Sequence, residues 1–424
     1  MNNRPGIDST FLLIAKRWKP EDCCDSTTFV NQQFAMELQK SGFGVLSTVL
    51  EATDEDVTDA QMQNITLILP KPKSRSYKIE KSDWLMYPDR YYRGLKKHVN
   101  VSFIVGHVNE KGYDTVEEAC IIRDRYFEQA ALVIFIHHIS DAKNFGRNNV
   151  IGERDILQFA KESVLVLVVG HSLHSYYLGR LEKPTILYLP APDEIYLASN
   201  VRPLPVDANI EILSVVNSSN KKALQYCNHI AQAMGKVTSN FSTMHQKCPI
   251  WKVCYKNEED VGRFDRDLFH KCKAVENLKK VDYYYDGDMN NLLTIFMQST
   301  LLIDTSEDVF SITGLNAIAA GLPVLFKENS SIANFLKSDC FLELHSGDIL
   351  VQLAVNETFD VAAGKWAEVV TKCLVDGDSK LLRASVLKEG LLKSMKEGSI
   401  KKSHQEILTW LRMKIEKSVT DCLN

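Results

Sequence analysis

The sequence lacks the features that would place it in a membrane or in an oxidising compartment. It has no run of about 18 apolar residues, the length that a membrane-spanning helix requires. It begins MNNRPGIDST, without the basic start and apolar core of a signal peptide. Its 10 cysteines form no CxxC pair, so we expect reduced, mostly packed thiols. These absences predict a cytoplasmic protein with no transmembrane segment.

An excess of charge of one sign is also missing. The formal net charge is -4 and charged residues make up 25% of the chain, so no basic stripe for nucleic acid or anionic lipid is expected. Cys248 and Cys254 bracket CPIWKVC, a spacing that matches no common metal site, and no metal site is predicted. The 424 residues, 45% of them hydrophobic, suffice for two or three globular domains.

Short apolar runs alternate with helix-period stretches along the chain. Runs with apolar residues on both faces are typical of strands in parallel sheets covered by helices. We expect such strands at 11–15, 44–50, 65–69, 101–105, 131–136, 164–169 and 185–190, and again at 211–216, 251–255, 281–285, 300–304 and 323–326. We expect helices at 29–40, 115–130, 153–162, 222–234, 364–375, 379–395 and 402–418. The pattern predicts an α/β fold with two consecutive sheets.

A linker between the two sheets is expected near 192–208, where Pro203 and Pro205 interrupt a stretch of little periodicity. The predicted domains are therefore 1–200 and 201–400, followed by a helix at 401–424. Ligands of parallel sheets bind at the carboxyl ends of the strands, so with two facing domains we expect the pocket in the cleft between them.

The segment 300–326 predicts a strand, a polar loop, a short helix and a second strand. TLLID is the first strand, and Gly321 and Pro323 are placed to end the helix and turn the chain back. The N-terminus of such a helix presents free N–H groups and the positive end of its dipole, which suits a phosphate.

This segment, DVFSITGLNAIAAGLPVLF, resembles the motif of the retaining mannosyltransferase and sucrose-phosphate-synthase-like glycosyltransferases, called group 1. Their motif has an acidic residue, a GFG-like turn, a second Glu and an Ala-x-Ala-Ala-Gly-x-Pro-Val tail. The residues 11–45, 281–306 and 330–348 also resemble this family, and the DWLMYP and FIHHISD blocks are similar to a divergent invertebrate branch. The resemblance implies the GT-B fold, two Rossmann-like domains facing across a cleft, with C-terminal helices packing back on the N-terminal domain.

The resemblance also implies a nucleotide-sugar donor as co-substrate, with no metal and no other cofactor. His137 takes the place of a His that faces the donor sugar, and Asp308 that of the first acidic residue, so both are catalytic candidates. His138 and His107 are the alternatives to His137. The candidates for substrate binding are Lys222, Ser311, Ile312, Thr313, Asn316 and Ser26. Lys222 would stabilise the leaving diphosphate. The alternatives without a ligand contact are that Lys222 is a solvated residue at a helix start and that Asp308 is a helix N-cap.

Four departures from the family pattern concern the donor. Asn217 stands where the family has Arg, Asn316 where Glu holds the ribose, Asp308 where it has Glu, and Asp25 and Ser26 where it has two glycines. The sequence therefore leaves two main interpretations open: an active retaining glycosyltransferase, or a catalytically degenerate GT-B module that binds a ligand or a protein. A different GT-B enzyme, such as a sugar-phosphate epimerase, is a third. The acceptor and any protein partner are not predicted.

Overall fold

A computed structural model gives the conformation of most of the chain. The described residues are 9–20, 25–69, 92, 94–95, 101–108, 115–138, 153–200, 209–216, 221–244, 246–255, 281–285, 289–306, 310–338, 350–353 and 357–423. None of the helices in these ranges combines the length and the apolar character needed to span a membrane.

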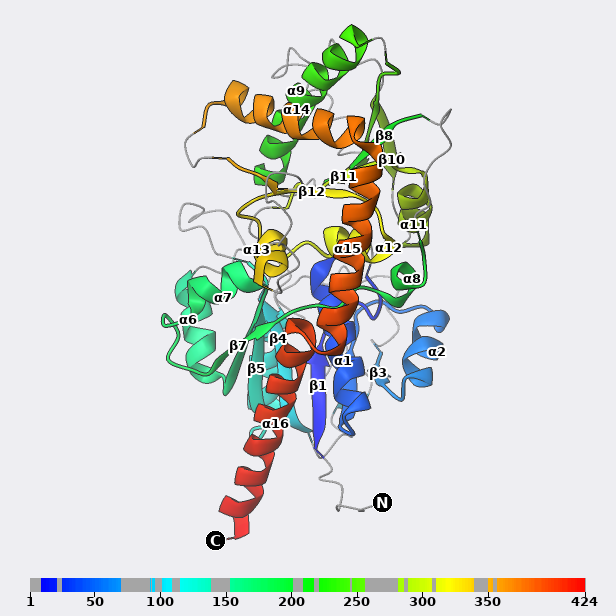
Figure 1. The fold of residues 1–424 in the computed structure, drawn as a ribbon. Coiled ribbons are helices and arrows are strands. Elements are labelled where there is room, and N and C mark those ends of the chain that lie inside the picture. Colours follow the sequence, from blue (N-terminus) through cyan, green and yellow to red (C-terminus); the bar gives the residue numbers. More distant parts are fainter. Residues whose placement is uncertain are drawn as a thin grey trace, which may run out of the picture. The chain divides into compact units, whose positions relative to one another are not determined.

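The chain divides into two compact units. Unit 1 comprises Met1–Pro20, Asp25–Pro190 and Lys401–Asn424, and unit 2 comprises Glu21–Cys24 and Ala191–Ile400. Each unit is built on one parallel sheet with helices around it (Figure 1). The α/β class with two consecutive parallel sheets, expected from the sequence, is confirmed.

Unit 1 contains a seven-stranded sheet in the order β3-β2-β1-β4-β5-β6-β7, in which every neighbouring pair is parallel. The central strands are apolar on both faces and are buried on both. The strands are β1 (Thr10–Ile14), β2 (Gly44–Thr48), β3 (Thr66–Ile68), β4 (Val101–Val108), β5 (Ala131–Ile136), β6 (Leu165–Val169) and β7 (Thr185–Tyr188). The helices are α1 (Ser26–Lys40), α2 (Asp54–Met62), α5 (Thr115–Tyr126), α6 (Glu153–Glu162), α7 (His171–Tyr177) and α16 (Ser399–Leu423).

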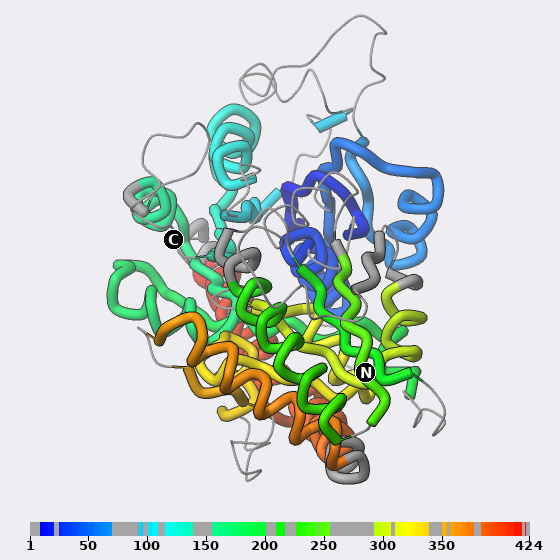
Figure 2. The backbone as a smooth tube through the Cα atoms, turned by 90° about the horizontal axis from the view of Figure 1, so that it is seen from above, coloured from blue at the N-terminus to red at the C-terminus, as the bar shows by residue number. Residues whose placement is uncertain are grey.

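Unit 2 contains a six-stranded parallel sheet in the order β10-β9-β8-β11-β12-β13. The strands are β8 (Glu211–Val216), β9 (Ile250–Tyr255), β10 (Val281–Tyr285), β11 (Leu301–Ile303), β12 (Val324–Lys327) and β13 (Leu350–Val351). The helices are α8 (Glu194–Leu197), α9 (Lys221–Thr243), α11 (Met289–Gln298), α12 (Ile312–Ala320), α13 (Ser331–Ser338), α14 (Phe359–Val375) and α15 (Gly377–Lys396). Helices α9 and α14, far apart in the sequence, lie side by side (Figure 2).

Both sheets reverse their strand order at one place, between β1 and β4 in unit 1 and between β8 and β11 in unit 2. Ligands of open parallel sheets bind outside the carboxyl ends of the strands at such a switch point. The segments that leave these strands therefore position the candidate site of each unit: α1 and the ends of β4 and β5 in unit 1, and α9 and α12 in unit 2.

The C-terminal helix α16 packs on unit 1 through side chains near its start. The hydroxyl of Ser403 donates to the carbonyl of Leu187 at 2.8 Å and accepts from the N–H of Leu189 at 3.1 Å. The ring of His404 stacks on Tyr188, with centroids 5.1 Å apart. These contacts tie α16 to strand β7, so the end of the chain belongs to the unit in which the chain begins.

Candidate functional site

A buried polar cluster lies at the carboxyl ends of β4 and β5 in unit 1. His107 is near the end of β4, His137 directly follows β5, and Asn31 is on α1. Atom Nδ1 of His107 lies 3.0 Å from Nε2 of His137, and Nε2 of His107 lies 2.9 Å from Oδ1 of Asn31. All three side chains are at most 2% exposed. We call Asn31, His107 and His137 the imidazole chain.

The surroundings keep both imidazoles of this chain neutral. Burial lowers the pKa of His107 to about 3. Burial also lowers the pKa of His137 well below its usual value, and the neighbouring His107 and His138 lower it further. The ring of His107 stacks on Phe135 at a centroid distance of 4.9 Å, and its backbone N–H donates to Oγ1 of Thr115 at 2.9 Å. The cluster is therefore rigid and uncharged at neutral pH.

Ser26 is the first residue of α1, which follows β1 in the chain, and it is half-buried. The carboxylate of Asp25 caps this helix by accepting from the N–H of Thr28 at 3.2 Å. Arg17, which could have faced Asp25, forms an ion pair with Glu51 at 2.6 Å. Asp25 thus has a local structural role at the position where the family has glycine.

In unit 2 the N-terminus of α12 is capped from within the chain. The hydroxyl of Ser311 accepts from the N–H of Gly314 at 2.9 Å and donates to Oδ1 of Asp304 at 3.0 Å. Asp304 follows β11, is 3% exposed, and also accepts from the N–H of Ser306 at 3.3 Å. Burial raises the pKa of its carboxyl to about 6, against the lowering effect of these hydrogen bonds. No motif or spacing in the sequence indicated Asp304 as part of this site.

The other candidates on α12 are buried. Ile312 and Thr313 form its first turn and are 4% and 8% exposed. Asn316 is fully buried, and its Oδ1 accepts from the backbone N–H of Asp193 at 3.0 Å. Its Nδ2 has no hydrogen-bond partner among the described residues. The amide oxygen that would contact a ribose is thus engaged within unit 2.

Two predicted site residues lie wholly or partly outside the described residues. Asp308, like the departure Asn217, lies outside the described residues. Lys222 is the second residue of α9, but its side chain lies outside them as well. The structure thus brings Ser311, Ile312, Thr313 and Asn316 together on α12, and places His137 and Ser26 in unit 1.

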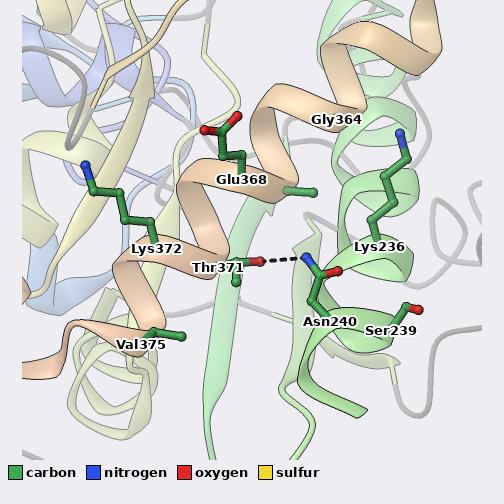
Figure 3. Close-up of a pocket in the computed structure, with 9 residues that line it drawn as sticks. Lys236, Ser239, Asn240, Gly364, Glu368, Thr371, Lys372 and Val375 are labelled. Carbon is green, nitrogen blue, oxygen red and sulfur yellow. Dashed lines mark hydrogen bonds between the residues drawn. The ribbon is translucent and has the colours of Figure 1, made fainter. Parts of the chain in front are cut away.

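Helices α9 and α14 border a surface groove of about 640 Å³. Asn240 of α9 donates to Oγ1 of Thr371 of α14 at 3.3 Å across it (Figure 3). The groove is open and its lining includes Lys236, Glu368 and Lys372, but none of the predicted site residues. In the described part of the chain, no three His, Cys, Asp or Glu side chains are grouped so that they could hold a metal ion.

Comparison with known proteins identifies the family of the chain from its sequence and its fold from solved structures. The family model described as Family 4 Glycosyltransferase in conflict systems matches residues 12–398, which is most of the chain. No curated protein sequence matches the chain.

Several solved structures are similar over their whole length. HepE of Anabaena in complex with UDP and glucose has a TM-score of 0.63 and 11% identity, covering 95% of this chain and 99% of that chain. The α,α-trehalose 6-phosphate synthase of Burkholderia multivorans has a TM-score of 0.64 and 12% identity, covering 98% of both chains. The E. coli trehalose-6-phosphate structure bound with UDP-2-fluoro glucose has a TM-score of 0.62 and 12% identity, covering 95% and 98%. At these identities the likeness establishes the fold alone, and it confirms the expected GT-B class.

Proposed function

The chain belongs to the family 4 glycosyltransferases of conflict systems, and we propose that it transfers a sugar from a nucleotide-sugar donor to an acceptor with retention of anomeric configuration. One observation carries the proposal: the motif segment folds as β11, a capped α12 and β12 at the switch point of the second sheet. Helix α12 thus begins where a parallel sheet binds its ligands, with a helix N-terminus that suits the phosphates of a donor.

The proposed roles follow the sequence candidates. His137 would contact the donor sugar and Asp308 its hydroxyls, while Lys222 would stabilise the leaving diphosphate. Ser26, Ser311, Ile312, Thr313 and Asn316 would line the donor. HepE of Anabaena in complex with UDP and glucose supports a UDP-sugar as the first donor to test. The metal-independent reaction, the invertebrate branch and the cytoplasmic location stay predictions.

A degenerate module that binds without turnover is the second candidate, and two contacts favour it. The oxygen of Asn316 already accepts from Asp193, and the carboxyl of Asp304 already contacts the cap of α12. A carboxylate so close to the helix N-terminus would repel a diphosphate, and its pKa of about 6 leaves it mostly charged at neutral pH.

Titration calorimetry with UDP, GDP, ADP and their glucose or mannose conjugates tests donor binding, which both candidate functions require. We expect one nucleotide to bind, and its sugar conjugate to bind at least as tightly. If none binds at millimolar concentration, donor binding is refuted and with it the transferase.

Turnover separates the two candidates. Donor consumption is followed by proton NMR, which also reports the anomer of the product; retention gives an α-linked product from an α-linked donor. Asp308→Asn is the matched variant, expected to bind the donor and to lose turnover. Binding by the wild-type chain without any donor consumption, over a panel of acceptors and with water, would favour the degenerate module.

A further inference from the structure

The imidazole chain leaves two buried polar atoms without a partner. Among the described residues, neither Nδ1 of His137 nor Nδ2 of Asn31 has a hydrogen-bond partner. Leaving a buried polar group unpaired costs about 1–3 kcal/mol. Such groups in a folded protein call for an explanation, and a ligand that pairs with them is one.

The hydrogen bonds of the chain determine which atoms carry protons. Oδ1 of Asn31 can only accept, so the 2.9 Å contact requires a proton on Nε2 of His107. Because a neutral imidazole has one proton, Nδ1 of His107 is then an acceptor. The 3.0 Å contact next along the chain therefore requires Nε2 of His137 to donate. The remaining atom, Nδ1 of His137, has a lone pair and no proton.

We propose that Asn31 and His107 are positioning residues that fix His137 in the tautomer with a bare Nδ1, so that unit 1 offers its ligand a neutral hydrogen-bond acceptor. This inference rests on the proposed function, because it names what His137 recognises: a hydroxyl of the transferred sugar. A hydroxyl can donate to the lone pair, whereas a phosphate oxygen without a proton cannot. The neutral acceptor thus selects the sugar over the diphosphate of the same donor.

Three features of the fold hold this arrangement. Strands β4 and β5 pair in parallel with His107 opposite Phe135. His107 therefore lies beside the end of the strand that His137 follows. The ring of His107 lies flat on Phe135, at an interplanar angle of 9°. The N–H of His137 donates to the carbonyl of Val108 at 3.2 Å, which fixes the backbone at the end of β5. Among the described residues, the hydrogen bond to Asn31 is the contact that sets which nitrogen of each imidazole carries the proton.

Long-range proton–nitrogen NMR of the chain labelled with ¹⁵N-histidine tests the proposal directly. The ring nitrogens report which atom bears the proton, and His107→Gln and His137→Gln assign the signals among the 11 histidines. For the wild-type chain without ligand we expect both His107 and His137 to be protonated at Nε2 only. A proton on Nδ1 of His137 would overturn the proposal.

Two substitutions of Asn31 distinguish the effect of its hydrogen-bond acceptor on the two tautomers from the effect of its packing. Asn31→Asp keeps an oxygen acceptor and should keep both tautomers, whereas Asn31→Leu keeps the size and removes the acceptor. In Asn31→Leu, His107 is expected to place its proton on Nδ1 and donate to His137, which then carries its own proton on Nδ1. Val30→Ala, at a fully buried position of the same helix, controls for loosening of α1. An unchanged His137 tautomer in Asn31→Leu would refute the positioning role.

Ligand binding provides the second readout. We expect Asn31→Leu to weaken UDP-glucose binding about tenfold and to leave UDP binding unchanged. The sugar hydroxyl would then have to accept from Nδ1 of His137, and its own proton would lose its acceptor. Asn31→Asp should bind UDP-glucose as the wild-type chain does. Equal weakening of UDP and UDP-glucose would contradict the proposal. If no nucleotide binds the wild-type chain, the proposed function fails, whereas the NMR result still decides the tautomer.

Discussion

The two units present buried polar groups of opposite character at the same place in their sheets. In unit 1 the groups are the bases His107, near the end of β4 at the switch point, and His137, after the neighbouring strand β5. In unit 2 the group is the acid Asp304, after β11 at the switch point. Burial lowers the pKa of His107 to about 3 and raises that of Asp304 to about 6. In each case the environment favours the uncharged form, by removing a proton from a base and by retaining one on an acid.

The buried groups of the two units therefore respond oppositely to pH. His107 has a folded-state pKa below its usual 6.5, so the stability it contributes is present above pH 6.5 and is lost as the pH falls toward 3. Asp304 has a folded-state pKa above its usual 3.8, so its contribution is present below pH 3.8 and is lost as the pH rises through 6. Near neutral pH the two histidines contribute their full stability, whereas the contribution of Asp304 has been lost.

The largest effect is expected from a methyl group added beside each cluster. The Cβ of Gly106→Ala in β4 would meet the backbone Cα of Val116 at 2.6 Å, whereas that of Gly314→Ala in α12 would meet the ring edge of Phe326 at 2.9 Å. A ring can move and a backbone cannot without shifting α5. We expect Gly106→Ala to lower the free energy of unfolding by about 3 kcal/mol, and Gly314→Ala by about 1 kcal/mol.

Urea unfolding measures the two substitutions, and hydrogen exchange on peptides of β4–α5 and β11–α12 locates them. Protection should fall in unit 1 alone for Gly106→Ala and in unit 2 alone for Gly314→Ala. If Gly314→Ala proved the more damaging of the two, the packing of α12 on β12 would be tighter than the close approach of α5 to β4.

Removing the charge of Asp304 should stabilise unit 2 at high pH. Asp304→Asn keeps an oxygen that accepts from Ser311 and Ser306, and it cannot ionise. At pH 8 we expect a gain of about 2 kcal/mol in the free energy of unfolding, since a raised pKa penalises the charged form by about 1.4 kcal/mol per unit and the new amide N–H group lacks an acceptor. The gain should vanish at pH 4, where Asp304 is protonated in the folded chain. Unfolding at both pH values, with His107→Gln compared in the same series, checks it. A gain of equal size at pH 4 would mean that charge is not the cause.

The cap of α12 should give the smallest effect of the three. Ser311→Ala removes the acceptor of the N–H of Gly314, which costs about 1 kcal/mol. It also removes a hydrogen bond that lowers the pKa of Asp304, so this pKa should rise further. Ser311→Thr keeps the hydroxyl and is the control. Carbonyl-carbon NMR of the Asp304 side chain follows its titration, and a midpoint that stayed in place or fell would show that Ser311 does not act on the carboxylate.

The sequence anticipated the apolar elements well. The strands expected at 131–136, 211–216 and 281–285 coincide with β5, β8 and β10, because runs of buried apolar residues have few other solutions. Gly321 ends α12 in the left-handed conformation, with a φ of 81°, as its place after a short helix indicates. Helix α2 was missed although Thr53 and Asp56 form a capping box at its start, since its outer face is polar and its period is weak.

The sequence by itself thus determined the class of fold, the family and the α12 segment, because these depend on local patterns along the chain. Only the tertiary structure decided which polar groups meet. Asn31 and His107 are 76 residues apart and come together because α1 and β4 lie at the same switch point. Asp304 reaches the cap of α12, and Asp193 the amide of Asn316, through turns that no periodicity encodes. Their pKa shifts arise from burial, which is a property of the packed sheet and not of any single segment.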